Sequence, residues 1–176
     1  MQKGQFRRQG RFLLIGAAFV IALDQWSKAW IRDNLALGES LPEKGLLRLI
    51  HTTNTGSAFG LFPNQTLFLI IISVAILLVI PLVLRYLITH YHSSSSGLCA
   101  ISLGIILGGA VGNLIDRLRF GFVTDFILVR LWNNFLWPAF NLADASIVIG
   151  TFALLYALFR AGVFKQAHDD SCKSTK

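Results

Sequence analysis

The sequence predicts an all-α membrane protein with four transmembrane helices and a small β-rich element outside the membrane. The 176-residue chain is 54% hydrophobic and 14% charged, which is typical of a membrane protein rather than of a soluble domain. Two stretches between its apolar segments favour strands. Four apolar runs are long enough to cross a hydrocarbon layer of ~30 Å, at about residues 12–31, 67–85, 97–116 and 140–160. We expect one membrane-embedded domain over residues 1–176, with a flexible tail at about 166–176.

The charge pattern predicts how the chain is oriented. The net charge of +7 comes from residues at the edges of the apolar runs, not from a basic stripe interleaved with aromatic residues, so no nucleic-acid partner is expected. By the positive-inside rule, both termini and the loop near residues 86–96 are expected in the cytoplasm, with loops 32–66 and 117–139 outside. The basic residues on which this rests precede the first run, close the second and follow the fourth: Lys3, Arg7, Arg8, Arg11, Arg85, Arg160, Lys165, Lys173 and Lys176.

The first run follows basic residues, as a secretory signal does, but no small-residue cleavage site comes soon after it, so we predict a retained anchor. The run ends in LDQWSKAW. Asp24 lies ~18 Å along the helix from Phe12, in the outer part of the bilayer. A carboxylate at this depth is costly and by default indicates function. Lys28 is one turn away, so the alternative is an Asp24–Lys28 pair that only stabilises the helix.

The first outer loop, residues 33–64, contains LLRLIHTTNTGSAFGLF. Its Leu, Ile and Thr content and its small turn residues predict one or two short strands at the membrane surface. Asn54 and Gly56 either form a simple hairpin turn or present donors to a peptide that is laid alongside as an added strand. His51 is interpreted as an interfacial histidine rather than a metal ligand.

The second and third runs differ in polarity. The second has no ionisable residue before Arg85 and is predicted to be a lipid-facing scaffold. At the outer end of the third run, Asn113 is expected to face the interior, where a buried amide needs partners. The next turn holds Asp116 and Arg117, for which a plain interfacial ion pair is one interpretation. Close helix packing is predicted from small residues spaced four apart, namely Gly104, Gly108 and Gly112.

The second outer loop and the fourth run each carry one further aspartate. GFVTDFILV has strand character, with Asp125 as its only charge. WNNFLWPAFN is interpreted as an aromatic approach to the interface in which Pro138 sets the entry to the helix. Asp144 lies about a turn inside the fourth run, and together with Asn141 it resembles a capping box. The alternative for Asp144 is therefore a carboxylate that only serves the helix N-terminus, worth ~1 kcal/mol.

This topology brings Asp24, Asp125, Asp144 and the corner from Asn113 to Arg117 to the outer leaflet or its surface. In one chemistry, two aspartates share a proton: the ionised one activates water against an amide carbonyl, and the protonated one polarises the carbonyl oxygen. In another, three or four aspartates hold Mg²⁺ for lipid-phosphate chemistry, but the closely spaced acidic pair that this needs, such as D-x-x-D, is not in the sequence.

Two functions other than catalysis also fit these aspartates. A small four-span ion or proton-coupled transporter subunit would use Asp24 and Asp144 as ion ligands or as a proton relay. A non-catalytic membrane scaffold is the third possibility.

Five motifs stand in order between the four apolar runs: LDQWSK (23–28), NTGSAF (54–59), GNLIDR (112–117), VTDF (123–126) and FNLADA (140–145). Over about residues 12–160 the chain thereby resembles the lipoprotein signal peptidases, or signal peptidase II. The resemblance implies an aspartic endopeptidase of the bacterial inner membrane, with both termini cytoplasmic and the active site on the extracytoplasmic side. Such an enzyme removes the signal peptide from a diacylglyceryl-modified prolipoprotein, just before the lipidated cysteine.

The resemblance also implies roles for individual residues. Asp125 and Asp144 match the catalytic pair. The family usually has Ala-Ala-Phe-Ser after the NTG turn, where this chain has Ser-Ala-Phe-Gly at 57–60, which bears on loop mobility and substrate preference. The first outer loop is expected to act as a lid over the scissile bond. The implied partners are prolipoprotein substrates and membrane lipid, for a monomeric enzyme without metal or other cofactor. Substrate contact or support of the site is implied for Asp24, Lys28, Asn54, Gly56, Asn113, Arg117 and Asn141.

Overall fold

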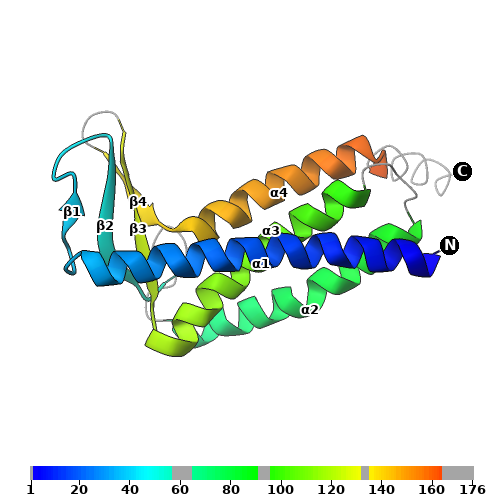
Figure 1. Ribbon diagram of the computed structural model, residues 1–176, viewed down its shortest axis with the longest axis horizontal. Coiled ribbons are helices and arrows are strands. Elements are labelled where there is room, and N and C mark those ends of the chain that lie inside the picture. Colours follow the sequence, from blue (N-terminus) through cyan, green and yellow to red (C-terminus); the bar gives the residue numbers. More distant parts are fainter. Residues whose placement is uncertain (1, 57–64, 91–95, 132–134, 164–176) are drawn as a thin grey trace, which may run out of the picture.

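The computed structural model describes residues 2–56, 65–90, 96–131 and 135–163. Within this part of the chain, four helices are long and apolar enough to cross a membrane, and four strands form one sheet (Figure 1). The predicted fold class is therefore confirmed. In chain order the elements are α1 (Gln2–Asn34), β1 (Ser40–Leu41), β2 (Leu47–Asn54), α2 (Thr66–His90), α3 (Ser96–Phe120), β3 (Val123–Arg130), β4 (Leu136–Phe140) and α4 (Leu142–Arg160).

The helix ends differ from the predicted spans. α1, α2 and α3 each extend beyond the apolar run that predicted them, because helical hydrogen bonds continue into the polar residues at the membrane edge. α4 begins later than residue 140, because Phe140 still belongs to β4 and Asn141 is the N-cap. The predictions for residues 57–60 and for the tail at about 166–176 lie outside the described residues, as does the last part of the first outer loop, for which a lid was predicted.

α3 is the central helix, and the other three pack on it. Its glycines face two neighbours. A Cβ added at Gly104 would clash with the carbonyl oxygen of Leu13 on α1. A Cβ at Gly109 would lie 2.5 Å from the carbonyl oxygen of Ala143 on α4. The absence of side chains at these positions therefore lets α1 and α4 approach the backbone of α3, as the spacing of small residues predicts.

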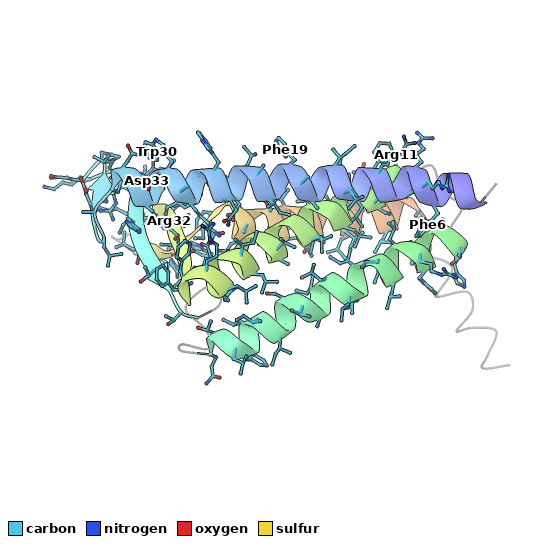
Figure 2. All side chains as sticks on the ribbon, turned by 60° about the horizontal axis from the view of Figure 1, so that its bottom comes forward. Phe6, Arg11, Phe19, Trp30, Arg32 and Asp33 are labelled. Carbon is cyan, nitrogen blue, oxygen red and sulfur yellow. The ribbon has the colours of Figure 1, made fainter. Side chains whose placement is uncertain are left out.

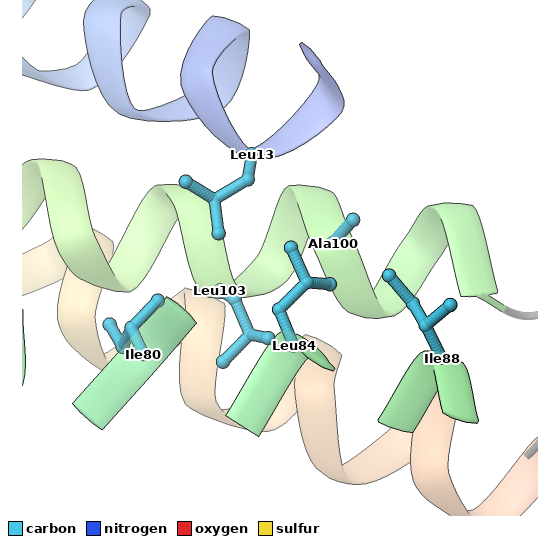
Figure 3. Close-up of a cluster of buried hydrophobic side chains, with 6 residues drawn as sticks. All are labelled: Leu13, Ile80, Leu84, Ile88, Ala100 and Leu103. Carbon is cyan, nitrogen blue, oxygen red and sulfur yellow. The ribbon is translucent and has the colours of Figure 1, made fainter. Parts of the chain in front are cut away.

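An apolar core fills the end of the bundle away from the sheet. It joins α1, α2 and α3 through buried side chains (Figure 3): Leu13, Ile80, Leu84, Ile88, Ala100 and Leu103. The outer faces of the helices are also apolar, and large side chains such as Phe19 and Phe152 are 65% and 68% exposed. Since lipid tails are as apolar as these side chains, the exposed surface fits a multi-pass membrane protein.

The sheet lies at the other end of the bundle, next to the end of α1 and the start of α4 (Figure 1). It is antiparallel, with the strand order β1-β2-β3-β4. A small cluster of Ile31, Leu35 and Phe126 ties it to α1. β3 is paired on both sides and most of its residues are buried, so a residue on β3 is held firmly against the helices.

β4 was not predicted as a strand. The segment interpreted as an aromatic approach to the interface is an edge strand of the sheet and pairs with β3. Pro138 lies within it, and proline is tolerated in an edge strand because one side of the strand has no partner. The chain passes from this strand into α4 through Asn141 alone. The sheet therefore sets directly where α4 begins.

Candidate active site

A cluster of buried polar residues lies where α1, α3 and the start of α4 meet β3. No water is available in a bilayer core, so such groups must find partners within the protein. The residues of this cluster are each 9% exposed or less: Asp24, Lys28, Asn113, Asp116, Arg117, Thr124, Asp125 and Asn141.

Asp125 lies in β3 and is held by two amides. Its Oδ1 accepts a hydrogen bond from Asn141 Nδ2 at 2.7 Å, and its Oδ2 accepts one from Asn54 Nδ2 at 2.8 Å. Burial, followed by the neighbouring carboxylate of Asp144, raises the pKa of Asp125 to about 7, although the two amide donors oppose the shift. A carboxyl group with such a pKa can hold or release a proton near neutral pH, as acid–base chemistry requires.

Asp144 lies in the first turn of α4. Its Oδ2 accepts a hydrogen bond from the backbone N–H of Asn141 at 3.3 Å, and its own backbone N–H donates to Asn141 Oδ1 at 2.9 Å. The capping box expected from the sequence is therefore present. The remaining oxygen, Oδ1, accepts a hydrogen bond from Asn113 Nδ2 at 2.8 Å. Asp144 thus caps the helix and at the same time faces the polar cluster, so the two interpretations of this residue are compatible.

Asn141 connects the two carboxylates. Its Oδ1 is occupied by the backbone N–H of Asp144, which turns its Nδ2 towards Asp125 Oδ1. The same Nδ2 lies 3.1 Å from Asn113 Oδ1. The side chain of one fully buried residue therefore separates Asp125 from the first turn of α4. At this separation the negative charge of Asp144 contributes to the raised pKa of Asp125, as a neighbouring like charge does.

Two cations and two acids from α1 and α3 support this arrangement. The Nζ of Lys28 lies 2.9 Å from Asp24 Oδ2, so the pair expected within α1 is present. It is part of a larger network, because the same Nζ lies 3.4 Å from Asp116 Oδ2. Arg32 approaches this oxygen at 3.9 Å. The interpretation of Asp116 and Arg117 as a plain interfacial pair is therefore wrong: the described ion pairs of Asp116 are with α1.

Three further members of the site were not predicted. Asp116 was expected at the same outer corner as the other acids, but no role in the site was predicted for it. Gln25 donates to Asp24, to Asp116 and to the carbonyl oxygen of Gly112 at 3.1–3.2 Å. The backbone N–H of Thr124 donates to Asp116 at 3.0 Å, one residue before Asp125. The only signal in the sequence was that Gln25 and Thr124 directly neighbour Asp24 and Asp125.

Arg117 holds the turn at the end of β2. Its Nη2 donates to the carbonyl oxygen of Gly56 at 2.9 Å, and Asn54 Oδ1 accepts from the backbone N–H of Gly56 at 2.8 Å. An asparagine that bonds the backbone two residues on forms a tight local turn. The turn directs the other end of the Asn54 amide towards Asp125, so it both ends the strand and supplies a donor to the site.

An apolar cavity of about 420 Å³ lies beside Asp144. Residues 137–140 of β4 and the outer face of α4 at Ala145, Ile147, Val148 and Ile149 line it. Asp144 is the only charged residue among them. An apolar segment could therefore lie against the sheet edge with its polar end next to this carboxylate.

The described carboxylates are not arranged as a site for a metal ion. Among the described residues, no group of three or more His, Cys, Asp or Glu side chains is arranged to hold a metal ion. Asp24 and Asp116 already face the ammonium of Lys28 and the amide of Gln25. A divalent cation at these carboxylates would meet a fixed positive charge.

The fold and the polar cluster define the class of protein. It is a multi-pass membrane protein with two neighbouring carboxylates at the place where its helices meet a small sheet. The sequence model of the family described as Signal peptidase (SPase) II matches residues 16–160. The chain belongs to the signal peptidase II family, as its five motifs indicate.

Individual relatives agree with this assignment. A lipoprotein signal peptidase of Syntrophotalea carbinolica is 42% identical over 165 residues, covering 90% of this chain and 98% of the relative. One of Moorella thermoacetica is 44% identical over 148 residues, with 84% and 91% covered. A bacterial membrane enzyme solved by the in meso method at 2.3 Å resolution has a TM-score of 0.69 at 28% identity, covering 84% of this chain and 87% of that one. These relatives support a peptidase and give no support to the transporter alternative.

Proposed function

We propose that this protein is an aspartic endopeptidase that removes signal peptides from diacylglyceryl-modified prolipoproteins and cleaves just before the lipidated cysteine. Membership of the signal peptidase II family and relatives named lipoprotein signal peptidases support the activity and the class of substrate. The observation that carries the aspartic mechanism is the bridge through Asn141, which joins the buried Asp125 on β3 to the half-buried Asp144 on α4.

In this mechanism Asp125 carries the shared proton and Asp144 is ionised. The pKa of about 7 supports a protonated Asp125, and the N-terminus of α4 favours negative charge on Asp144. Asp144 takes a proton from a water molecule as the water oxygen attacks the amide carbonyl, while Asp125 hydrogen-bonds the carbonyl oxygen. When the carbon–nitrogen bond breaks, the proton held by Asp144 passes to the departing nitrogen. The products are the carboxyl end of the signal peptide and a free amino group on the cysteine.

The remaining residues of the site hold the two acids in place. Asn54 and Asn141 orient Asp125, and Asn113 orients Asp144. Arg117 and Gly56 fix the turn that bears Asn54. Groups that are held in position before the substrate binds need not reorganise during the reaction. Asp24 and Lys28 join α1 to this arrangement.

The proposal places the sheet and the site on the extracytoplasmic side. The first residues of α1 and the end of α4 lie at one end of the bundle and the sheet at the other (Figure 1). Basic residues gather at the first end, including Arg7, Arg8 and Arg160, which favours the cytoplasm for that end. The apolar cavity beside Asp144 supports access from the bilayer, where the acyl chains of the substrate remain. A monomer suffices, because both acids come from one chain.

The deciding experiment is cleavage of a diacylglyceryl-modified prolipoprotein in detergent by the wild type and by Asp125→Asn and Asp144→Asn. Each amide variant is expected to lose about 10³-fold or more of kcat, since members of a catalytic unit are rarely dispensable. Asp33→Asn, at an exposed position on α1, is the matched control and is expected to cleave like the wild type. Near-normal turnover by either site variant, at equal amounts of folded protein, rules the pair out.

A chelator separates the aspartic mechanism from the Mg²⁺ alternative. Activity of the wild type is expected to persist after dialysis against EDTA. Loss of activity with the chelator, together with recovery on addition of Mg²⁺, contradicts the aspartic mechanism.

A further inference from the structure

Lys28 occupies an unusual place for a lysine. Its side chain is fully buried in the protein, and its Nζ faces three oxygen atoms: Asp24 Oδ2 at 2.9 Å, Asn113 Oδ1 at 2.9 Å and Asp116 Oδ2 at 3.4 Å. An ammonium group has three donors, so all of them are used. Burial of an ion pair is often no more stabilising than an apolar contact of the same size. Stability alone therefore gives little reason for a lysine at this position.

The contact with Asn113 has a directional consequence. An ammonium group donates hydrogen bonds and cannot accept them, so the atom of Asn113 that faces Lys28 must be its oxygen. The amide nitrogen of Asn113 is then turned towards Asp144 Oδ1, 2.8 Å away. If the amide were rotated by half a turn, its NH₂ group would face the ammonium and its oxygen would face the carboxylate. Both contacts would then be repulsive.

We propose that Lys28 is a positioning residue for the catalytic pair, which acts by fixing the side-chain amide of Asn113 with its donor towards Asp144. The inference rests on the proposed aspartic function. Asn141 also donates to Asn113 Oδ1, at the longer distance of 3.1 Å. Without Lys28, Asn141 would be the one described donor left to Asn113 Oδ1. The amide would then be held less firmly with its donor towards Asp144.

The charge of Lys28 also reaches the second acid. It lowers the pKa of Asp125, although burial and Asp144 raise it more strongly. Removing Lys28 would therefore raise the pKa of Asp125. The charged groups that face Lys28 or the pair from the packed elements are Asp24 and Arg32 on α1, Asp116 and Arg117 on α3, Asp125 on β3, and Asp144 on α4.

The test compares two substitutions of a cation by methionine on the same helix. Lys28→Met removes the contact with Asn113. Arg11→Met is the control, because Arg11 is exposed on the same helix and lies towards the other end of α1 from Arg32 and the polar cluster (Figure 2). Cleavage of a diacylglyceryl-modified prolipoprotein is measured from pH 5 to 9, at equal amounts of folded protein.

Lys28→Met is expected to lower kcat by about 10- to 100-fold, the usual effect of losing a hydrogen bond to a charged group, with KM changed less than about twofold. The basic limb of its profile is expected to move to higher pH. Arg11→Met is expected to leave the kcat and the basic limb as in the wild type, because Arg11 is exposed and lies outside the polar cluster. If Lys28→Met accumulates no folded protein, the double variant Lys28→Met with Asp24→Asn, which keeps the network neutral, is measured against the same expectations.

The outcomes separate this inference from the function on which it rests. If Lys28→Met, or the double variant in its place, matches Arg11→Met in kcat and in the basic limb, the lysine is only structural and the inference is overturned. If Asp125→Asn and Asp144→Asn are inactive in the same assay, the proposed function still stands. If either of those amide variants is active, the proposed aspartic mechanism is wrong. The inference rests on that mechanism and is then wrong as well.

Discussion

Asp24 on α1 accepts a hydrogen bond from the backbone N–H of Ala143 on α4, at 3.0 Å across 119 positions of sequence. The first N–H groups of a helix have no partner within it, and here a side chain from another helix supplies one. Ala143 directly precedes Asp144. The carboxylate of Asp24 therefore fixes the turn of α4 that carries a proposed catalytic acid.

The first prediction concerns stability. Asp24→Ala is expected to destabilise the protein by about 3–5 kcal/mol, because it leaves the buried ammonium of Lys28 short of a partner and the N–H of Ala143 without an acceptor. Thermal unfolding in detergent measures the loss. Asp33→Ala on the exposed end of the same helix is the control and is expected to unfold like the wild type. Equal unfolding temperatures for the two variants would show that the contact carries no stability.

A second prediction concerns pH. The mechanism needs Asp125 in its protonated form, and its pKa is about 7. Since a carboxyl group loses its proton above its pKa, kcat/KM is expected to fall as the pH rises through about 7. The profile of kcat/KM from pH 5 to 9 reports this ionisation in the free enzyme. A flat profile between pH 6 and 9 contradicts the assignment of Asp125 as the acid.

The third prediction uses Asn54. Its amide donates to Asp125 Oδ2 and favours the ionised form, which lowers the pKa of Asp125. Asn54→Ala is expected to raise that pKa and to move the basic limb of kcat/KM to higher pH. Asn34→Ala is the control, since the described bond of the Asn34 amide is to the carbonyl oxygen of Trp30 at an exposed site. A basic limb that moves to lower pH in Asn54→Ala has the wrong sign for this contact.

The fourth prediction links helix packing to activity. Gly109→Ala places a Cβ 2.5 Å from the carbonyl oxygen of Ala143 and 2.8 Å from Ile147, so α4 must move away from α3. Overpacking of this kind costs about 1–3 kcal/mol, and the shift displaces Asp144 as well. We expect a lower unfolding temperature together with a lower kcat. Gly10→Ala on α1, where a Cβ meets nothing within 4 Å, is expected to change neither.

The contacts that the sequence predicted well are local ones. The Asp24–Lys28 pair and the capping box of Asn141 and Asp144 depend on spacings of four and three residues, which helix geometry fixes. The four helices follow from runs of apolar residues, because a bilayer of given thickness demands a given length. The meeting of Asp125 with the start of α4 followed from the topology, since both lie at the same end of the bundle.

The contacts that escaped prediction depend on how separate elements are aligned. Asp116 reaches Lys28 because of the position at which α3 packs along the axis of α1, and the hydropathy pattern does not determine that position. The position depends on close backbone contacts such as that between Gly104 and Leu13. β4 was not predicted because proline is rare within strands, so the segment was interpreted as an aromatic approach to the interface. The neighbouring strand β3 supplies the pairing that makes it a strand.

The salt bridge within α1 bears on how the protein is made. This helix emerges from the ribosome before α3 exists, so its buried acid and base must enter the membrane without Asp116. The two groups lie one turn apart on the same helix and reach each other at 2.9 Å. The nascent segment therefore carries its own counter-ion and can leave the translocon as a neutral pair. The polar centre of the finished enzyme assembles later, when α3 docks against a helix that is already in the bilayer.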